Sequence, residues 1–183
     1  AHSLFKGALF MVVGAVDHGT GTRDATRLSG LGRAMPITFI VAFAAALSMA
    51  GLPPFFGFLA KEEIYAALAH ANPRAILFTG VTVAGNAAML AIALAVGLKP
   101  FIGKTARTPR DAHEAPLLLW LGPALLALGG VVSALFSSGF HAGISTPMAT
   151  AIAGNPAPVE VSLMPHIGLP LALSLFTVAL GVM

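Results

Sequence analysis

The stretch Met49-Ala-Gly-Leu-Pro-Pro-Phe-Phe-Gly-Phe-Leu-Ala-Lys61 decides how the rest of the chain folds. It lies inside a run of mainly apolar residues, 36–69, that is too long for one straight crossing, because a helix of about 20 residues already spans a bilayer core roughly 30 Å thick. Pro53 and Pro54 lack backbone donors and clash with the preceding helical turn. The sequence therefore predicts a transmembrane helix that is broken at this stretch.

Gly51 and Gly57 flank the two prolines and tolerate the bend that the prolines impose. A broken transmembrane helix is stable only where neighbouring protein or trapped water satisfies its freed carbonyl groups, and such breaks recur at ion sites near the middle of the membrane. Lys61 follows the break by about two helical turns. We therefore expect Gly51, Pro53, Pro54 and Gly57 to form the break and Lys61 to lie close to an ion path.

The composition places the chain among integral membrane proteins. Of its 183 residues, 57% are hydrophobic and 9% are charged, and the mean hydropathy is +0.88. In soluble domains about a quarter of the residues are charged. The net charge of +3 comes from basic residues scattered between apolar runs, whereas nucleic-acid binding requires a clustered basic patch. We expect an all-α polytopic helix bundle, a multi-pass protein of the cell membrane that contacts the lipid bilayer and binds no nucleic acid.

Interruptions in the apolar pattern divide the chain into four crossings. A turn at Asn72-Pro73 is expected between the second and the third, because the residue before a proline is pushed out of the helical region. Prolines and small residues interrupt the segment after the fourth crossing, which indicates a surface segment with one short interfacial helix. The expected helices cover residues 1–16, 37–70, 75–98, 116–136 and, at the surface, 146–153, and a last apolar run begins near residue 166 and is cut off at 183.

The basic residues of the loops predict the orientation of the crossings. Lys and Arg are enriched in the cytoplasmic loops of membrane proteins. They are frequent in residues 17–35 and 99–114, whereas the segment after the fourth crossing contains none, so all crossings alternate without conflict if the two basic loops are cytoplasmic. We therefore expect residues 1–138 to form the helix bundle, residues 139–165 to be extracytoplasmic, and residues 166–183 to begin a further, truncated transmembrane helix.

Two lysines lie within the apolar runs rather than in the loops. A lysine at the centre of a transmembrane helix costs roughly 2.5 to 3.5 kcal/mol on insertion scales, so Lys6 and Lys61 need polar partners or water. Lys61 has an alternative interpretation, in which its amine reaches the membrane interface and Glu62 and Glu63 are the solvated end of the helix. His2 lies one turn before Lys6 on the same helix face, which makes this pair a candidate for proton transfer.

The other polar residues provide no metal or catalytic motif. His18, His113 and His141 are expected in solvated loops, His166 begins the last apolar run, and Asn86 is expected to bond a neighbouring helix. No pair of histidines has metal-ligand spacing with a third candidate nearby, the chain has no cysteine, and it contains neither a phosphate-binding loop nor a nucleophile elbow. We therefore expect no metal, no cofactor and no enzymatic activity.

Several motifs, in their order along the chain, resemble one family of membrane subunits. They are His2-Ser-Leu-Phe-Lys6, Leu9-Phe-Met-Val-Val-Gly14, Gly30-Leu31, Met35-Pro36 and Ala50-Gly-Leu-Pro-Pro-Phe-Phe-Gly-Phe-Leu-Ala-Lys-Glu62. The family is that of the antiporter-like subunits of respiratory complex I and of the multisubunit Mrp cation/proton antiporters. The loop Asp17-His-Gly-Thr-Gly-Thr-Arg-Asp24 and the pair Pro165-His166 are more similar to the large antiporter-like subunit of the Mrp antiporters than to the complex I subunits.

The resemblance implies a fold, a function and partners. In the antiporter-like fold that it implies, residues 1–138 contain the second half of the helix repeat and the crossings that follow. Lys61 matches the family's lysine after the helix break, and His2 and Lys6 match the pair that relays protons towards it. The implied function is cation/proton antiport, in which protons drive the export of Na⁺ by a complex with other membrane subunits. The chain resembles an interior part of such a subunit.

Two other functions are consistent with the sequence. A proton-pumping membrane subunit of an NADH:quinone oxidoreductase or a related hydrogenase would carry the same lysines, and it would co-purify with flavin or iron-sulfur subunits. In a structural membrane scaffold, both lysines would form packing ion pairs. Conservative Lys→Gln changes would then alter stability but not ion flux.

Overall fold

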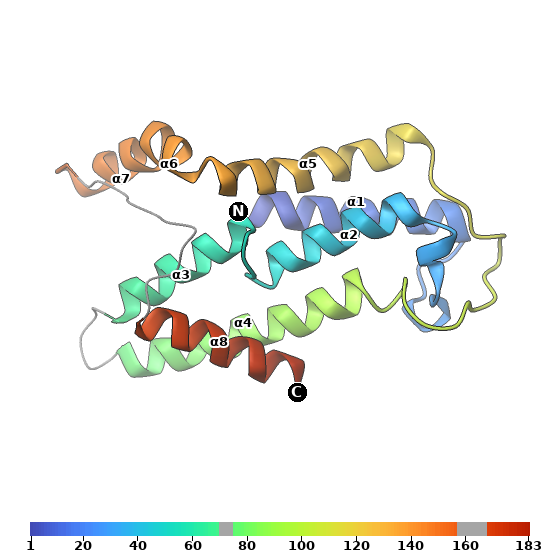
Figure 1. The fold of residues 1–183 in the computed structure, drawn as a ribbon, viewed down its shortest axis with the longest axis horizontal. Coiled ribbons are helices and arrows are strands. Elements are labelled where there is room, and N and C mark those ends of the chain that lie inside the picture. The colour runs from blue at the N-terminus through green and yellow to red at the C-terminus, as the bar shows by residue number, and fades with distance from the viewer. Residues whose placement is uncertain (70–74, 157–167) are drawn as a thin grey trace.

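The computed structural model describes residues 1–69, 75–156 and 168–183, and within these ranges every regular element is a helix (Figure 1). The longer helices run along the long axis of the molecule (Figure 1). The all-α membrane bundle expected from the sequence is therefore confirmed. The expected turn at Asn72-Pro73 and the expected start of the last helix at His166 lie outside the described residues.

The first helix, α1 (His2–Thr20), is longer than the sequence predicted. We expected it to end at Val16, but it continues for one more turn, in which the Thr20 hydroxyl donates to the Val16 carbonyl at 2.7 Å. Gly21 then ends the helix in the left-handed conformation, with φ of +73°. Two 3₁₀ turns follow, η1 (Ala25–Arg27) and η2 (Leu31–Arg33).

The second crossing is interrupted where the two prolines occur. Its first half, α2 (Pro36–Met49), has a proline in its first turn, and its second half, α3 (Phe56–Ala69), begins directly after the break. The two halves meet closely, since a Cβ atom built at Gly57 would lie 1.8 Å from the Ser48 carbonyl oxygen. Glycine is thus required at the start of α3, and the carboxyl end of α2 lies against the first turn of α3.

The remaining helices follow the expected pattern. The expected third and fourth crossings are α4 (Ala75–Gly97) and α5 (Leu117–Leu135). Among the described residues, α4 from Ile76 onward and α5 are each long and apolar enough to cross a membrane, whereas α2 and α8 are shorter apolar helices. After α5 the chain forms α6 (Ser137–Phe140), the π-helical turn η3 (His141–Ser145), α7 (Thr146–Ala153) and α8 (Leu169–Val182).

Small residues let neighbouring helices approach closely. A Cβ atom built at Gly97 would lie 2.3 Å from the Ala46 Cβ, so α4 packs directly on α2. One built at Gly181 would lie 2.8 Å from the Ala87 carbonyl oxygen, so α8 packs on α4. Close packing of this kind holds transmembrane helices together, because lipid leaves little hydrophobic driving force between them.

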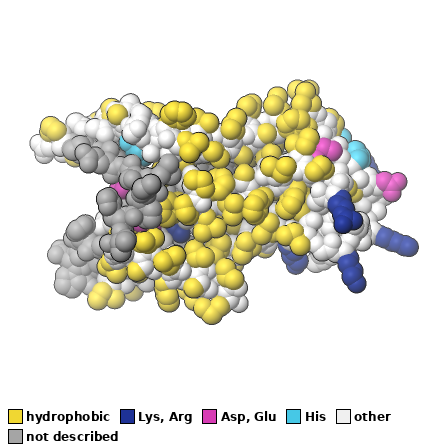
Figure 2. Space-filling model, in the orientation of Figure 1, with side chains coloured by type: hydrophobic (Ala, Val, Ile, Leu, Met, Phe, Trp, Pro, Cys, Tyr) yellow, Lys and Arg dark blue, Asp and Glu magenta, His cyan; other side chains and the backbone are white. Residues whose placement is uncertain are grey.

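The outward surface of the bundle is apolar. Large hydrophobic side chains are widely exposed on α2, α4 and α5, with Ile40 at 67%, Ile76 at 81% and Leu118 at 83%. Figure 2 shows hydrophobic side chains over the middle of the molecule, and Lys and Arg side chains gathered mainly at one end. Such a surface is suited to contact with lipid or with neighbouring membrane subunits rather than with water.

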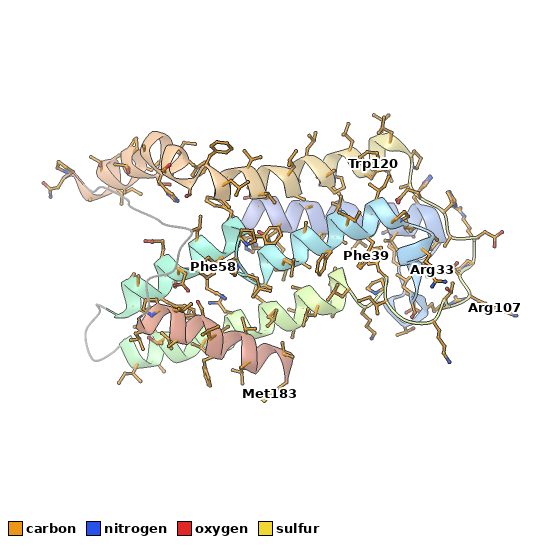
Figure 3. All side chains as sticks on the ribbon, in the orientation of Figure 1. Arg33, Phe39, Phe58, Arg107, Trp120 and Met183 are labelled. Carbon is orange, nitrogen blue, oxygen red and sulfur yellow. The ribbon has the colours of Figure 1, made fainter. Side chains whose placement is uncertain are left out.

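The two basic loops, residues 21–35 and 98–116, lie together at this end, which we call the loop end. Figure 3 shows Arg33 from one loop and Arg107 from the other in this part of the molecule. The loops are joined by backbone hydrogen bonds, among them that from the Gly32 N–H to the Phe101 carbonyl at 3.0 Å. Both basic loops therefore face the same side of the bundle, as the predicted orientation requires.

Glu114 closes the loop end over the start of α2. Its carboxylate accepts hydrogen bonds from the N–H groups of Ile37, at 2.8 Å, and Thr38, at 3.3 Å, and from the Thr38 hydroxyl. The first N–H groups of a helix have no partner within the helix, and the helix dipole favours a negative charge beside them. A side chain from the distant loop thus caps α2.

Candidate functional site

Lys61 lies on the side of α3 that faces the break. Its side chain is 6% exposed. A Cβ atom built at Gly51 would lie 3.0 Å from Lys61 Cε and 3.1 Å from Nζ, so the end of the lysine rests against the backbone of the break. This burial favours a lysine held inside the bundle over the alternative interpretation, in which the amine extends to the membrane interface.

The four residues predicted to form the break have different positions. Gly51 adopts a left-handed conformation, with φ of +66°, and leaves the space that Lys61 occupies. Gly57 allows α3 to start against the end of α2. Pro53 and Pro54 are exposed, and the peptide bond between them is cis. The glycines thus shape the inner side of the break, and the prolines interrupt the helix on its outer side.

The end of α2 provides an electrostatic reason for a lysine at this place. The carboxyl end of a helix carries a partial negative charge, which favours a nearby cation by about 0.3 to 1 kcal/mol. This is less than the cost of burying an ammonium group, and Lys61 forms no ion pair with a described residue. The ammonium group therefore needs water or further polar groups around it.

A cavity of about 250 Å³ beside Lys61 has room for this water. Its wall includes His2 from α1, Ser48 and Gly51 from the break, Lys61 itself, and Asn86 from α4. A cavity of this volume has room for water. It brings together the ammonium group of Lys61, the imidazole of the exposed His2 and the amide of Asn86 from three helices, among mainly apolar lining residues. We call this cavity with its lining residues the Lys61 site.

Lys6 lies outside the Lys61 site. It is half-buried and lines a second cavity, of about 240 Å³, among apolar side chains of α1, α2 and α4. Met49 lines both cavities. The structure therefore places His2 and Lys61 on one cavity and Lys6 on another.

Asn86 belongs to a group of buried polar side chains, most of which the sequence analysis missed. As expected, Asn86 bonds a neighbouring helix, since its Nδ2 donates to the Tyr65 hydroxyl at 3.1 Å; the Tyr65 oxygen also lies 2.6 Å from Thr177 Oγ1. Nearby, the Ser174 hydroxyl donates to the Glu62 carboxylate, so Glu62 is not simply a solvated helix end. Glu62 and Tyr65 are three residues apart on α3, and Ser174 and Thr177 are three residues apart on α8. Each pair therefore lies on one helix face, and this spacing was a sequence signal for the contact.

His141 also differs from the prediction of a solvated loop residue. It lies in the π-helical turn η3 and is 9% exposed, with its ring against Phe56 at a centroid distance of 6.2 Å. Its Nδ1 lies 2.9 Å from the Ser145 hydroxyl, and its Nε2 is buried without a hydrogen-bond partner among the described residues. Continuous helical structure through 137–153 draws this histidine into the bundle, whereas sequence composition indicated a loose segment.

The Lys61 site has the chemistry of proton exchange rather than of metal binding. Within the described residues, no three His, Cys, Asp or Glu side chains are placed to hold a metal ion. A lysine and a histidine, by contrast, each gain and lose a proton, and water in the cavity can carry protons between them. The Lys61 site therefore combines two groups that can change charge with a cavity, beside the helix break, that has room for water.

Comparisons with known proteins identify the family of the chain. Residues 1–85 match the family described as NADH:quinone oxidoreductase/Mrp antiporter, TM. A relative from Staphylococcus haemolyticus (strain JCSC1435), named as the A1 subunit of a Na(+)/H(+) antiporter, is 42% identical over 163 residues, which are 84% of this chain and 20% of that protein. A relative of the same name from Staphylococcus aureus (strain JH9) is 41% identical over 74% of this chain and 18% of its own length.

A solved structure shares the fold. A chain in the structure of the Mrp complex from Dietzia sp. DQ12-45-1b superposes with a TM-score of 0.82 at 32% identity, over 99% of this chain and 20% of that chain. The present chain thus spans about a fifth of the length of these proteins: the match covers 20% of the Staphylococcus haemolyticus protein and 20% of the Dietzia chain. Sequence motifs, helix break and structural match agree: the chain belongs to the family of transmembrane subunits shared by NADH:quinone oxidoreductases and Mrp antiporters.

Proposed function

We propose that this chain is the proton-carrying part of a cation/proton antiporter subunit, in which protons moving through His2, Lys6 and Lys61 drive the export of Na⁺. The observation that carries the proposal is the buried Lys61 side chain, which lies beside a helix break and a cavity that also contains a histidine. The names of the relatives favour antiport over the proton pump of an oxidoreductase. The proposed partners are the other membrane subunits of the complex.

Proton transfer at Lys61 would act on its neighbours through the electric field. Two like charges about 10 Å apart repel by about 1.7 kcal/mol at an effective dielectric constant near ~20. Protonation of Lys61 therefore disfavours protonation of a nearby lysine. When Lys61 loses its proton, the nearby lysine can be protonated again. Lys6 and Lys61 line separate cavities that share Met49 as a lining residue, so proton transfer from Lys6 requires a connection past Met49 or a route through His2.

Replacement of Lys61 in the complete complex tests the proposal. Lys61→Ala should abolish Na⁺-driven proton movement in inverted membrane vesicles, measured with a pH-sensitive dye, while the complex still assembles. Lys99→Ala is the matched control, because Lys99 is an exposed lysine just after α4 and should be dispensable. Normal transport by the Lys61 variant would refute the proposal. Normal flux with lowered stability in Lys61→Gln would indicate a purely structural role.

We further propose that the loop end is cytoplasmic, that residues 139–165 are extracytoplasmic, and that residues 166–183 begin a further crossing, after the bundle of residues 1–138. The absence of cysteine from the chain makes this testable with single cysteines. In intact cells, a membrane-impermeant maleimide should label Ala151→Cys, at an exposed position of α7, but should label Thr105→Cys only after permeabilisation. The reverse labelling pattern would invert the orientation.

A further inference from the structure

We propose that Asn86 is a functional group of the Lys61 site: its carbonyl oxygen, held in place by Tyr65 and Thr177, accepts a hydrogen bond from the protonated Lys61 through water in the cavity. This inference rests on the proposed function and adds a positioning network to the same site. The inference requires that the Asn86 amide has one orientation. This orientation follows from the hydrogen bonds between α3, α4 and α8.

The direction of each hydrogen bond in this group follows from Thr177. Its hydroxyl has a single hydrogen, which is donated to the Leu173 carbonyl at 2.7 Å. Towards Tyr65, Thr177 can therefore act only as an acceptor, so the Tyr65 hydroxyl is the donor across their 2.6 Å contact. The Tyr65 oxygen then accepts from its other neighbour, which must present a donor. The atom of Asn86 that faces Tyr65 is consequently Nδ2, at 3.1 Å.

The Asn86 carbonyl oxygen is thereby turned away from Tyr65. Asn86 is one of the residues that line the cavity, and this oxygen is the acceptor of its side chain. A protonated lysine has three donors and no acceptor, and Lys61 forms no ion pair with a described residue, although the charge of the adjacent Glu62 acts on it at longer range. A water bound to the Asn86 oxygen therefore favours protonated over neutral Lys61.

The supporting residues hold Asn86 firmly. Tyr65 is 0% exposed and Thr177 is 1% exposed, so their hydrogen bonds do not compete with bulk water. Tyr65 also lies one helical turn after Lys61 on α3. The helix α8 therefore contributes to the site indirectly, by fixing the tyrosine that fixes the amide.

Apart from Lys61, few titratable groups near the cavity could shift the pH profile of transport. His2 from α1 lines the same cavity, Lys6 from α1 lines the next one, and α3 contributes Tyr65 itself and Glu62, whose carboxylate is bonded to Ser174. The described parts of α2, α4 and α8 contain no Asp, Glu, His, Lys or Arg. A change at Asn86 should therefore be read out mainly through Lys61.

The test is the pH profile of Na⁺/H⁺ antiport by the complete complex carrying substitutions at Asn86. In the proposed role, Asn86→Leu removes an acceptor, so the alkaline limb of the profile should move to lower pH by about one unit, which corresponds to tenfold weaker proton retention. Asn86→Asp adds a negative charge, so the limb should move to higher pH. Tyr65→Phe, which removes the hydroxyl that orients the amide, should shift the limb in the direction of Asn86→Leu by about half as much.

The control is Thr82→Val on α4, one turn before Asn86, half-buried and outside the cavity wall, which should leave the profile unchanged. Shifts of the same sign in Asn86→Leu and Asn86→Asp, or no shift in either, would overturn this inference. If Lys61→Ala is inactive in the same assay, such a result leaves the proposed function intact; if Lys61→Ala transports normally, the proposed function itself fails. Tyr65→Phe keeps the inference testable if a substitution at Asn86 prevents assembly.

Discussion

The loop end and the break region, residues 48–61, differ in how many hydrogen-bond and ion-pair partners their charged groups have. At the loop end, the carboxylate of Glu114 is fully engaged by the start of α2, and backbone hydrogen bonds join the two loops. In the break region, the ammonium group of Lys61 is buried beside a cavity and has no ion-pair partner among the described residues.

In the proposed function, this difference separates a residue that holds the fold from one that takes part in transport. Glu114 forms hydrogen bonds to the first turn of α2 and so anchors that helix. Lys61 has no such set of bonds among the described residues, which suits the proton-carrying role that we propose for it. Substitutions at the loop end should therefore reduce stability more than transport, whereas substitutions in the break region should reduce transport more than stability.

After the loss expected from Lys61→Ala itself, the largest effect is expected from Gly51→Ala. The new Cβ would lie 3.0 Å from Lys61 Cδ and 3.1 Å from Nζ, so the lysine must move away from the break. We expect at least a tenfold loss of antiport, measured in vesicles, because a shift of about 1 Å in a functional group costs about that or more. The left-handed conformation of residue 51 adds about 1 to 2 kcal/mol of destabilisation.

Gly154→Ala is the matched control for this substitution. Gly154 also has a left-handed conformation, with φ of +70°, but a Cβ built there meets no atom within 4 Å. Both variants should therefore lower the melting temperature of the complex by a similar amount, while only Gly51→Ala should lose transport. Equal losses of transport in the two variants would mean that backbone strain, and not the position of Lys61, is responsible.

An intermediate effect, on stability rather than on transport, is expected from Glu114→Ala. The change leaves the N–H groups of Ile37 and Thr38 without their acceptor, and loss of such a cap costs about 0.5 to 2 kcal/mol. The melting temperature of the purified complex should therefore fall by a few degrees, while antiport per assembled complex stays within about twofold of the wild type. Glu63→Ala, at an exposed glutamate, should change neither. A transport defect that exceeds the loss of stability would place Glu114 in the ion path.

The break region could be predicted from the sequence because its signals are local. Two prolines between glycines, followed by a lysine within an apolar run, indicate a broken helix and a buried charge without knowledge of any neighbour. Most helix bounds were predicted for the same reason. The exceptions are the end of α1, where the turn that includes Thr20 is stabilised by a hydrogen bond to Val16, and residues 137–145, which are helical although a loose segment was expected.

The polar group around Asn86 could not be predicted in full because its members come from three helices. The sequence indicates that Asn86 needs a partner on a neighbouring helix, but the choice of Tyr65 depends on how α4 packs against α3 and α8. The same holds for Glu114, whose partner is the start of a helix far away in the chain. His141 was misread because small residues and prolines within 137–165 suggested a loose surface segment, whereas His141 lies in a helical turn with its ring against Phe56.

The smallest effect is expected from Arg23→Ala, although Arg23 forms an ion pair with Asp17 at 2.8 Å. Arg23 is 77% exposed, and an exposed pair contributes about 0 to 1 kcal/mol because water and salt screen it and because ordering the two side chains costs entropy. The melting temperature should therefore change by about a degree or less, and the small difference should vanish in 1 M salt, where the Debye length is about 3 Å. Glu114→Ala should retain its effect in the same salt, because its hydrogen bonds to α2 are partly buried. The opposite outcome would be equal losses of melting temperature in Arg23→Ala and Glu114→Ala that both disappear in 1 M salt. General attraction between charges, and not the hydrogen bonds of Glu114, would then stabilise the loop end. The contrast with the break region would be wrong.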